Sequence, residues 1–287
     1  MKDIKVDFNR EKEWWDAKAS KEGKDLADES INRVLRWREI EKHLKGVRTI
    51  LEVGAATGAF SIPLAKRGFT VTHVDFSSEM LKIAKRKAKG LKNITFVQAN
   101  STDLSQFDNR SFDLVLNMDG AVSFAGSKAD QAIKESCRVT KKTLILTVSN
   151  LAELIVILTN SSLEVSNKFM KAVYTMFSEG LWHQKMFKDN NLLTKETEQK
   201  YFGALKAYSS NQLKKILEKN HMRVIRVGGL GSLANLCRIE TIQKVKRNKK
   251  LFNEFIELCD KFDKEIMPDG PGTRQRAGLI AVAKPKL

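Results

Sequence analysis

The residues best suited to chemistry lie in a short glycine-containing turn and at an acidic residue further along the chain. The turn spans residues 52–58 (EVGAATG), and Asp75 follows 21 positions after Gly54. Glycine lets the backbone approach a ligand closely and adopt conformations that a β-carbon forbids. An ionised aspartate at a strand end accepts hydrogen bonds from both hydroxyls of a ribose. Together these residues predict a site for an adenosine-type cofactor.

The turn departs from the dinucleotide fingerprint G-x-G-x-x-G. That pattern needs glycine at Ala56 and glycine or alanine at Ala59, so it is only half met. A nicotinamide-dependent oxidoreductase is therefore a less favoured interpretation. A non-catalytic cofactor-binding protein is a further alternative, which only an activity assay can exclude.

Alternating strand and helix patterns surround these residues and must position them. Apolar, β-branched runs predict strands at residues 49–53, 69–74, 94–97, 112–118, 143–148, 222–227 and 278–283. Helical spacing predicts helices at residues 29–44, 60–67, 78–90, 128–138, 210–219 and 239–266. Ser77 is an expected N-cap, and Ser209 with Gln212 forms an expected capping box. The pattern predicts an α/β fold with a doubly wound, mostly parallel sheet and helices on both faces.

We expect a single domain over residues 1–287. Residues 1–48 form an N-terminal helical cap, and residues 49–149 form the cofactor-binding core. Residues 150–204 break the strand–helix rhythm and are rich in aromatic side chains, which favours a helical lid insertion over the substrate. Residues 205–287 complete the sheet with added helices.

Composition excludes several other classes. The three cysteines, Cys137, Cys237 and Cys259, have no metal-ligand spacing, so neither a disulfide framework nor a metal site is predicted. The most apolar stretch, residues 143–159, is interrupted by polar residues and is too short to span a membrane. No apolar signal core follows the first residues. We expect a cytoplasmic protein without a membrane partner.

The net charge is +17, and residues 205–287 hold 18 basic and 8 acidic residues. A positive field favours anionic partners such as RNA. The lysines are scattered, however, so a merely soluble surface is the favoured interpretation and RNA a less favoured partner.

Residues 50–58 (ILEVGAATG) resemble motif I of the class I S-adenosylmethionine-dependent methyltransferases, with Ala56 in place of the usual middle glycine. Residues 74–77 (VDFS) resemble the acidic end of that family's second strand, and residues 96–104 (FVQANSTDL) its adenine-edge loop. Residues 111–115 (SFDLV) resemble the fourth strand. The resemblance implies a Rossmann-like, seven-stranded sheet and S-adenosyl-L-methionine as cofactor, with S-adenosyl-L-homocysteine as product.

The resemblance also implies roles for individual residues. Glu52 and the Gly54 backbone would hold the methionine amino group, and Asp75 would bind the ribose. Phe76 would pack on the adenine, and Asn100 stands where the family usually has Asp for the adenine amino group. The alternatives are a strand-end residue facing solvent for Glu52, a helix-capping acid for Asp75, and core packing for Phe76 and Met118. The full set of expected cofactor-binding residues is Glu52, Gly54, Ala55, Ala56, Gly58, Asp75, Phe76, Asn100, Ser101, Thr102, Asn117 and Met118.

The catalytic residue cannot be assigned, because methyl transfer from a sulfonium needs alignment more than protein groups. Asp119 and His183 are weak candidates for a base or a substrate anchor. For Asp119 a loop-capping role is the alternative, and the loop lacks an N-P-P-Y motif, which counts against methylation of nucleobase amino groups.

The acceptor is expected to be a small organic molecule, with an RNA or a protein as the alternative. Trp14, Trp15, Tyr174, Trp182 and Tyr201 are candidates for lining the lid, with core packing as the alternative for each. Arg36 and Arg38 are candidates for the methionine carboxylate. The oligomeric state is not predicted.

Overall fold

Strand β1 (Thr49–Val53) carries the glycine turn at its carboxyl end and lies inside a nine-stranded sheet. The computed structural model describes residues 6–22, 29–118, 120–156, 159, 170–183, 203–270 and 278–286. Strands β2 (Thr70–Asp75), β3 (Ile94–Gln98), β4 (Phe112–Asn117) and β5 (Thr140–Asn150) run parallel to β1, in the order β3-β2-β1-β4-β5. The strand order therefore reverses between β1 and β4, which is where open α/β sheets bind ligands.

The C-terminal part of the chain completes the sheet beside β5. Strand β9 (Leu279–Pro285) pairs antiparallel with β5, and β8 (Met222–Gly229) pairs antiparallel with β9. These seven strands correspond to the seven runs expected from the sequence. The predicted α/β fold with a mostly parallel sheet is confirmed.

Two additional strands extend from the carboxyl end of β5. Strand β7 (Ala204–Tyr208) pairs in parallel with the last two residues of β5, and β6 (Leu181–His183) pairs antiparallel with β7. The segment at residues 150–204, expected to be helical, thus contributes β6 as well as helix α7 (Met170–Glu179) and a helical turn at residues 151–156. A strand of three residues is too short for a period-two pattern to reveal.

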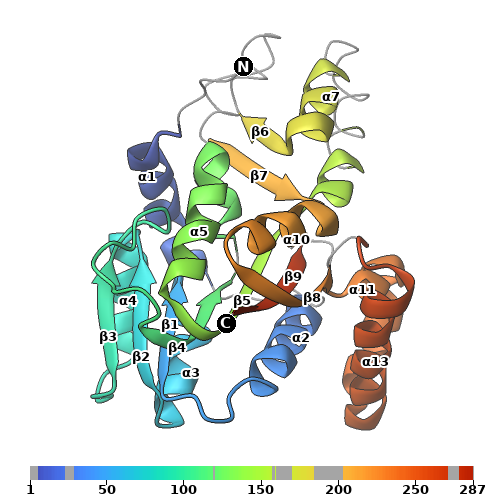
Figure 1. Cartoon of the computed structure of the whole chain (residues 1–287). Coiled ribbons are helices and arrows are strands. Elements are labelled where there is room, and N and C mark those ends of the chain that lie inside the picture. The colour runs from blue at the N-terminus through green and yellow to red at the C-terminus, as the bar shows by residue number, and fades with distance from the viewer. Residues whose placement is uncertain are drawn as a thin grey trace.

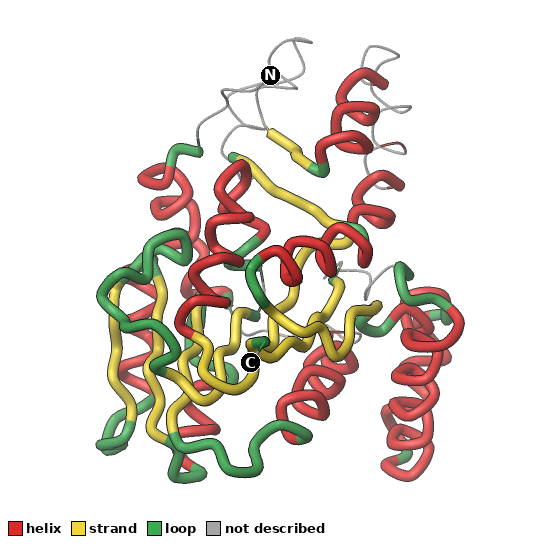
Figure 2. Tube along the Cα trace, viewed as in Figure 1, coloured by secondary structure: helices red, strands yellow, loops and turns green. Residues whose placement is uncertain are grey.

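Helices cover both faces of the sheet (Figures 1 and 2). On one face lie α2 (Glu29–Glu41), α3 (Ser61–Lys66), α11 (Ser232–Leu236), α12 (Ile239–Arg247) and α13 (Lys249–Lys261). On the other lie α5 (Ala129–Val139) and α10 (Ser210–Lys219). Ile50 and Leu51 of β1 belong to different core clusters, as expected where neighbouring side chains point to opposite faces.

Local signals in the sequence fix several helix ends. The Ser77 hydroxyl accepts from the Met80 amide at 3.1 Å and starts α4 (Ser78–Lys87), which lies along β2 and β3. Ser209 and Gln212 form the expected capping box at α10. Short helical segments η2 (Ser123–Lys128) and η4 (Phe262–Ile266) follow β4 and α13. In the part of the chain that the structure describes, no helix is long and apolar enough to cross a membrane.

The N-terminal extension forms α1 (Phe8–Lys18) and the short helical turn η1 (Ala19–Lys21). Asp7 caps α1, because its side chain accepts from the amides of Asn9 and Arg10. Helix α1 lies beside α4 (Figure 1), so the first described residues of the chain return to the sheet edge that carries the glycine turn.

Candidate functional site

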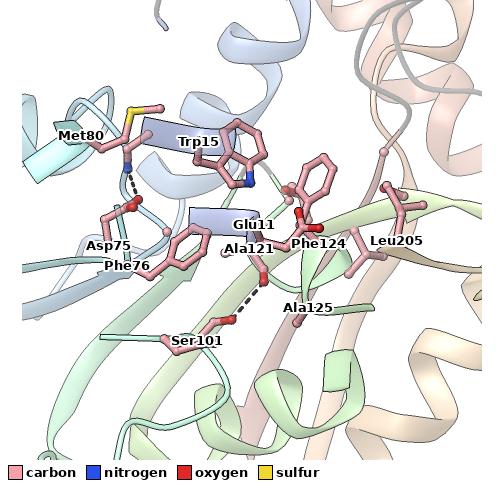
Figure 3. A pocket seen from close by; sticks show the side chains of 18 of the residues that line it. Glu11, Trp15, Asp75, Phe76, Met80, Ser101, Ala121, Phe124, Ala125 and Leu205 are labelled. Carbon is pink, nitrogen blue, oxygen red and sulfur yellow. Dashed lines mark hydrogen bonds between the residues drawn. The ribbon is translucent and has the colours of Figure 1, made fainter. Parts of the chain in front are cut away.

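A pocket with a cavity volume of about 420 Å³ opens at the carboxyl edge of the sheet. Its wall includes the turn after β1, the end of β2, the loops after β3 and β4, the end of β5, and helices α1 and α2. In Figure 3, Asp75, Phe76 and Met80 lie on one side and Phe124, Ala125 and Leu205 on the other, with Trp15 and Glu11 between them. A volume of this size is in the usual range for a small-molecule or cofactor site.

The turn after β1 forms part of this wall through Gly54 and Ala56. Gly54 has φ +67°, and a β-carbon there would lie 2.3 Å from the β-carbon of Ala121, so this position requires glycine. Ala56 also has a positive φ, of 46°, although it carries a β-carbon. Ala56, which stands where the resembled motif has its middle glycine, therefore keeps the same turn but with a strained backbone.

Ala55 and Gly58, which were also expected at the cofactor, support the turn instead of lining the pocket. The Ala55 amide donates to the Val74 carbonyl at 2.9 Å, and the Gly58 amide donates to the Ala55 carbonyl at 2.9 Å. Lys87 of α4 holds the turn from outside, since its ammonium donates to the Thr57 hydroxyl at 2.9 Å. The turn is thus held by contacts within the protein itself.

Asp75, at the end of β2, lines the pocket with its carboxylate held in place. One oxygen accepts from the Ala56 amide at 2.8 Å and the other from the Ser77 amide at 2.9 Å. Each carboxylate oxygen has two lone pairs, so both retain acceptor capacity for a diol. Burial raises the pKa of Asp75 to about 6, although the hydrogen bonds from the two amides act to lower this pKa.

Glu52 lies beneath the turn and is not among the described pocket-lining residues. It is 2% exposed, and its carboxylate accepts from the Ser61 amide at 2.6 Å. The Ser61 hydroxyl in turn contacts Nδ1 of His73 at 2.7 Å. Burial raises the pKa of Glu52 to about 7, and burial lowers the pKa of His73 to about 4. His73, expected to be structural, belongs to this buried network.

The loop after β3 supplies Ala99, Asn100 and Ser101 to the pocket, next to Phe76. The Ser101 hydroxyl donates to the Ala121 carbonyl at 3.0 Å and ties this loop to the one after β4 (Figure 3). Oδ1 of Asn100 accepts from the amide and from the hydroxyl of Thr102, each at 3.0 Å. The Asn100 carbonyl, expected to face an adenine amino group, is thus already engaged within its own loop.

The side chains at the end of β4 turn away from the pocket. Asn117 is fully buried and donates to the Ser136 hydroxyl of α5 at 3.1 Å, and Met118 packs in the core beside α2 and α3. The pocket is reached instead by Gly120 and Ala121. Asp119 lies outside the described residues.

The expected lid residues divide into three groups. Trp15 lines the pocket, and Trp14 packs edge-on against it with ring centroids 4.8 Å apart. Trp182 packs in a separate core cluster, and Tyr174 is 68% exposed. Tyr201 lies outside the described residues. His183 is buried in β6 and is not among the described residues that line the pocket.

The two arginines of α2 that were expected at the methionine carboxylate lie in different places. Arg36 is 4% exposed and lines the pocket, whereas Arg38 forms an ion pair with Glu257 at the surface. Of these two arginines, Arg36 is the one that brings a positive charge to the site.

Sequence reasoning named Trp15 as a lid candidate but missed Phe8 and Glu11 of the same helix, which also line the pocket. The spacing of three and four residues places all three on one face of α1. That spacing was visible in the sequence, but nothing there singled out Phe8 or Glu11.

Comparison with known proteins agrees with this geometry. Residues 50–143 match the family model described as a methyltransferase domain. A demethylmenaquinone methyltransferase of Tropheryma whipplei is 40% identical over 83 residues, which are 28% of this chain and 34% of that protein. EEF1A lysine methyltransferase 2 of Homo sapiens is 33% identical over 129 residues, 40% of this chain and 52% of that protein. This chain thus spans about a third to a half of the length of the curated relatives it matches.

The whole fold has solved counterparts. A SAM-dependent methyltransferase of Methanosarcina mazei superimposes with a TM-score of 0.54 at 18% identity, covering 87% of this chain and 97% of that one. At this identity the likeness concerns the fold alone.

Proposed function

We propose that this chain, whose residues 50–143 form a methyltransferase domain of the class I fold, transfers a methyl group from S-adenosyl-L-methionine to a small organic acceptor. The observation that carries the proposal is the fixed carboxylate of Asp75 beside the glycine turn, within a single pocket that also contains apolar and aromatic walls. The pocket thus offers a nucleotide-binding side and a second side for an acceptor.

The residues present fit the cofactor. Asp75 keeps one acceptor site on each oxygen for the ribose hydroxyls. Phe76 offers an apolar surface for the adenine, and Ala99, Asn100 and Ser101 border its edge. Arg36 supplies the charge for the methionine carboxylate. Glu52 acts through the turn that it supports, because its carboxylate is bound to the Ser61 amide.

When bound, the cofactor supplies an activated methyl group. The protein then has to hold the acceptor in line and exclude water, which together account for most of the catalysis in such a displacement. Trp15, Phe124 and Leu205 give the acceptor side of the pocket its apolar walls. We propose residues 1–287 as one catalytic unit, in which α1 and, from the described part of residues 150–204, Glu153 and Leu154 contribute to the pocket wall.

A protein acceptor is the second candidate. The basic stretch at residues 205–287 and the partial match to a protein named as a lysine methyltransferase favour it. The small volume of the pocket favours the first candidate, although a single side chain can also enter it.

The test uses S-adenosyl-L-methionine labelled in its methyl group and a cell extract separated into small molecules, RNA and protein. The proposal expects enzyme-dependent label in the small-molecule fraction. Label only in the protein or RNA fraction would replace it by the corresponding alternative. No label in any fraction, together with no cofactor binding, would remove the proposal.

A further inference from the structure

The pocket is acidic although the chain is strongly basic. The described lining residues include the carboxylates of Glu11, Glu22, Asp75 and Glu153 but only one cation, Arg36, in a chain with a net charge of +17. Glu22 lies near Asp75, since its charge contributes to raising the pKa of Asp75. Glu11 and Glu153 are the other two carboxylates among the described lining residues.

Glu11 is held at the pocket by a hydrogen bond from the backbone amide of a single glycine. One carboxylate oxygen, Oε1, accepts from the Gly203 amide at 2.6 Å. A β-carbon at position 203 would lie 2.1 Å from this oxygen, so any larger residue would displace the carboxylate. Glu11 comes from α1 and Gly203 from the start of β7, so two distant segments meet to fix one carboxylate.

The second oxygen of Glu11, Oε2, is buried and has no hydrogen-bond partner among the residues that the structure describes. The residue is 3% exposed, and burial raises its pKa. The charge of Asp7 acts in the same direction, whereas the amides of Gly203 and Ala204 and the charge of Arg10 lower it. Leaving a buried acceptor unsatisfied costs about 1–3 kcal/mol, and more when it is charged. An apolar side chain at this position would avoid that cost, which indicates that Oε2 meets a donor from a ligand.

The walls around Glu11 suit a cation. Trp15 and Phe124 lie edge to face with ring centroids 5.0 Å apart, and both line the pocket with Glu11 (Figure 3). Aromatic faces attract ammonium groups, and the attraction strengthens where water is excluded. A carboxylate with a free acceptor site beside two aromatic rings disfavours phosphate-bearing acceptors and favours protonated nitrogen.

We propose that the acceptor is an amine and that Oε2 of Glu11 receives its proton. This inference rests on the proposed function. The ammonium N–H bond breaks and its proton passes to Oε2. The freed nitrogen lone pair forms the bond to the methyl carbon while the sulfur–methyl bond breaks, and that electron pair stays on sulfur. The methylated ammonium leaves, and Glu11 returns its proton to solvent.

The test compares Glu11→Gln with Glu13→Gln. Glutamine keeps an oxygen for the Gly203 amide but cannot accept a proton, and Glu13 is an exposed residue of the same helix. Binding of 2-phenylethylamine, of its alcohol counterpart 2-phenylethanol and of a lysine-containing peptide is measured by calorimetry on enzyme saturated with S-adenosyl-L-homocysteine. Methyl transfer to each is measured as a function of pH.

We expect the amine or the peptide to bind at least tenfold more tightly than the alcohol. Glu11→Gln should remove this preference, lower any turnover by about 10²- to 10⁴-fold, and leave the affinity for S-adenosyl-L-homocysteine within about twofold of wild type. Preference for the peptide over the free amine would identify a lysine side chain as the source of the amine. Equal binding of amine and alcohol, or an unaltered preference in Glu11→Gln, would overturn the inference. Loss of S-adenosyl-L-homocysteine binding by the wild type would instead sink the proposed function.

Discussion

Asp16 of α1 and Ser77 at the start of α4 are joined by a hydrogen bond in which the Ser77 hydroxyl donates to the Asp16 carboxylate. The same carboxylate accepts from the Glu79 amide at 3.2 Å and from the Lys12 ammonium at 2.9 Å. Burial acts to raise the pKa of Asp16, but the hydrogen bonds from Ser77 and Lys12 outweigh it and the pKa is lowered. Because Ser77 also donates its amide to Asp75, α1 is fastened directly beside the carboxylate that we propose binds the ribose.

This contact predicts that α1 retains the cofactor. Asp16→Ala removes an acceptor at a helix start, an effect of about 1 kcal/mol, and should speed dissociation of S-adenosyl-L-homocysteine by about fivefold. Stopped-flow displacement measures the rate. Glu13→Ala, on an exposed position of α1, is the matched control. An unchanged rate in Asp16→Ala would show that α1 does not restrain the cofactor.

The contact between Gly54 and Ala121 predicts a sharp difference between two glycine substitutions. Gly54→Ala should abolish measurable binding of S-adenosyl-L-homocysteine, because its β-carbon would overlap that of Ala121. Gly46→Ala introduces a β-carbon at a similar φ of +71°, where no atom lies within 4 Å, and so reports the backbone strain alone. Calorimetry and thermal unfolding of both variants test this. Equal loss of binding in the two would contradict the steric explanation.

Ala56 offers a stabilising substitution. Its positive φ is costly for any residue with a β-carbon, and glycine removes that cost while increasing the entropy of the unfolded chain. We expect Ala56→Gly to raise the free energy of unfolding by about 0.5–1 kcal/mol. Ala55→Gly, at the neighbouring position without a positive φ, should lower it. Denaturant unfolding gives both values, and destabilisation by Ala56→Gly would contradict the assignment of strain.

The buried Glu52 predicts a pH dependence of stability. Its pKa rises from 4.5 to about 7 on folding, so the folded state binds more protons than the unfolded state between these values. The free energy of unfolding contributed by Glu52 therefore falls as pH increases from about 4.5 to 7. His73, with a lowered pKa, acts in the opposite sense, so wild type and Glu52→Gln must be compared directly. Their difference in denaturant midpoint should change across this interval, and a constant difference would refute the prediction.

The sequence allowed the sheet, its caps and the glycine turn to be predicted because their causes are local. Ser77 and the pair Ser209 and Gln212 cap helices through contacts within three residues, and the β1 pattern needs only five residues. The order of elements then implies where Asp75 and Gly54 meet, and both line the pocket.

The rest depends on contacts between distant segments. Strand β6 exists because it pairs with β7, and its three residues are too few for a period-two pattern to reveal. Asn117 turns toward Ser136 and away from the pocket, which requires the packed structure. The Asn100 carbonyl is the exception, since the residue that occupies it, Thr102, is only two positions away. Glu11 reaches the pocket only because Gly203 receives it.

Calorimetric titration with S-adenosyl-L-methionine, on the wild type, Asp75→Ala and the surface control Asp108→Ala, tests the central claim most directly. We expect micromolar binding with one site in the wild type and in Asp108→Ala, and at least a tenfold weaker affinity in Asp75→Ala, equivalent to about 1.4 kcal/mol. Absence of binding to the wild type, or undiminished binding to Asp75→Ala, would contradict it.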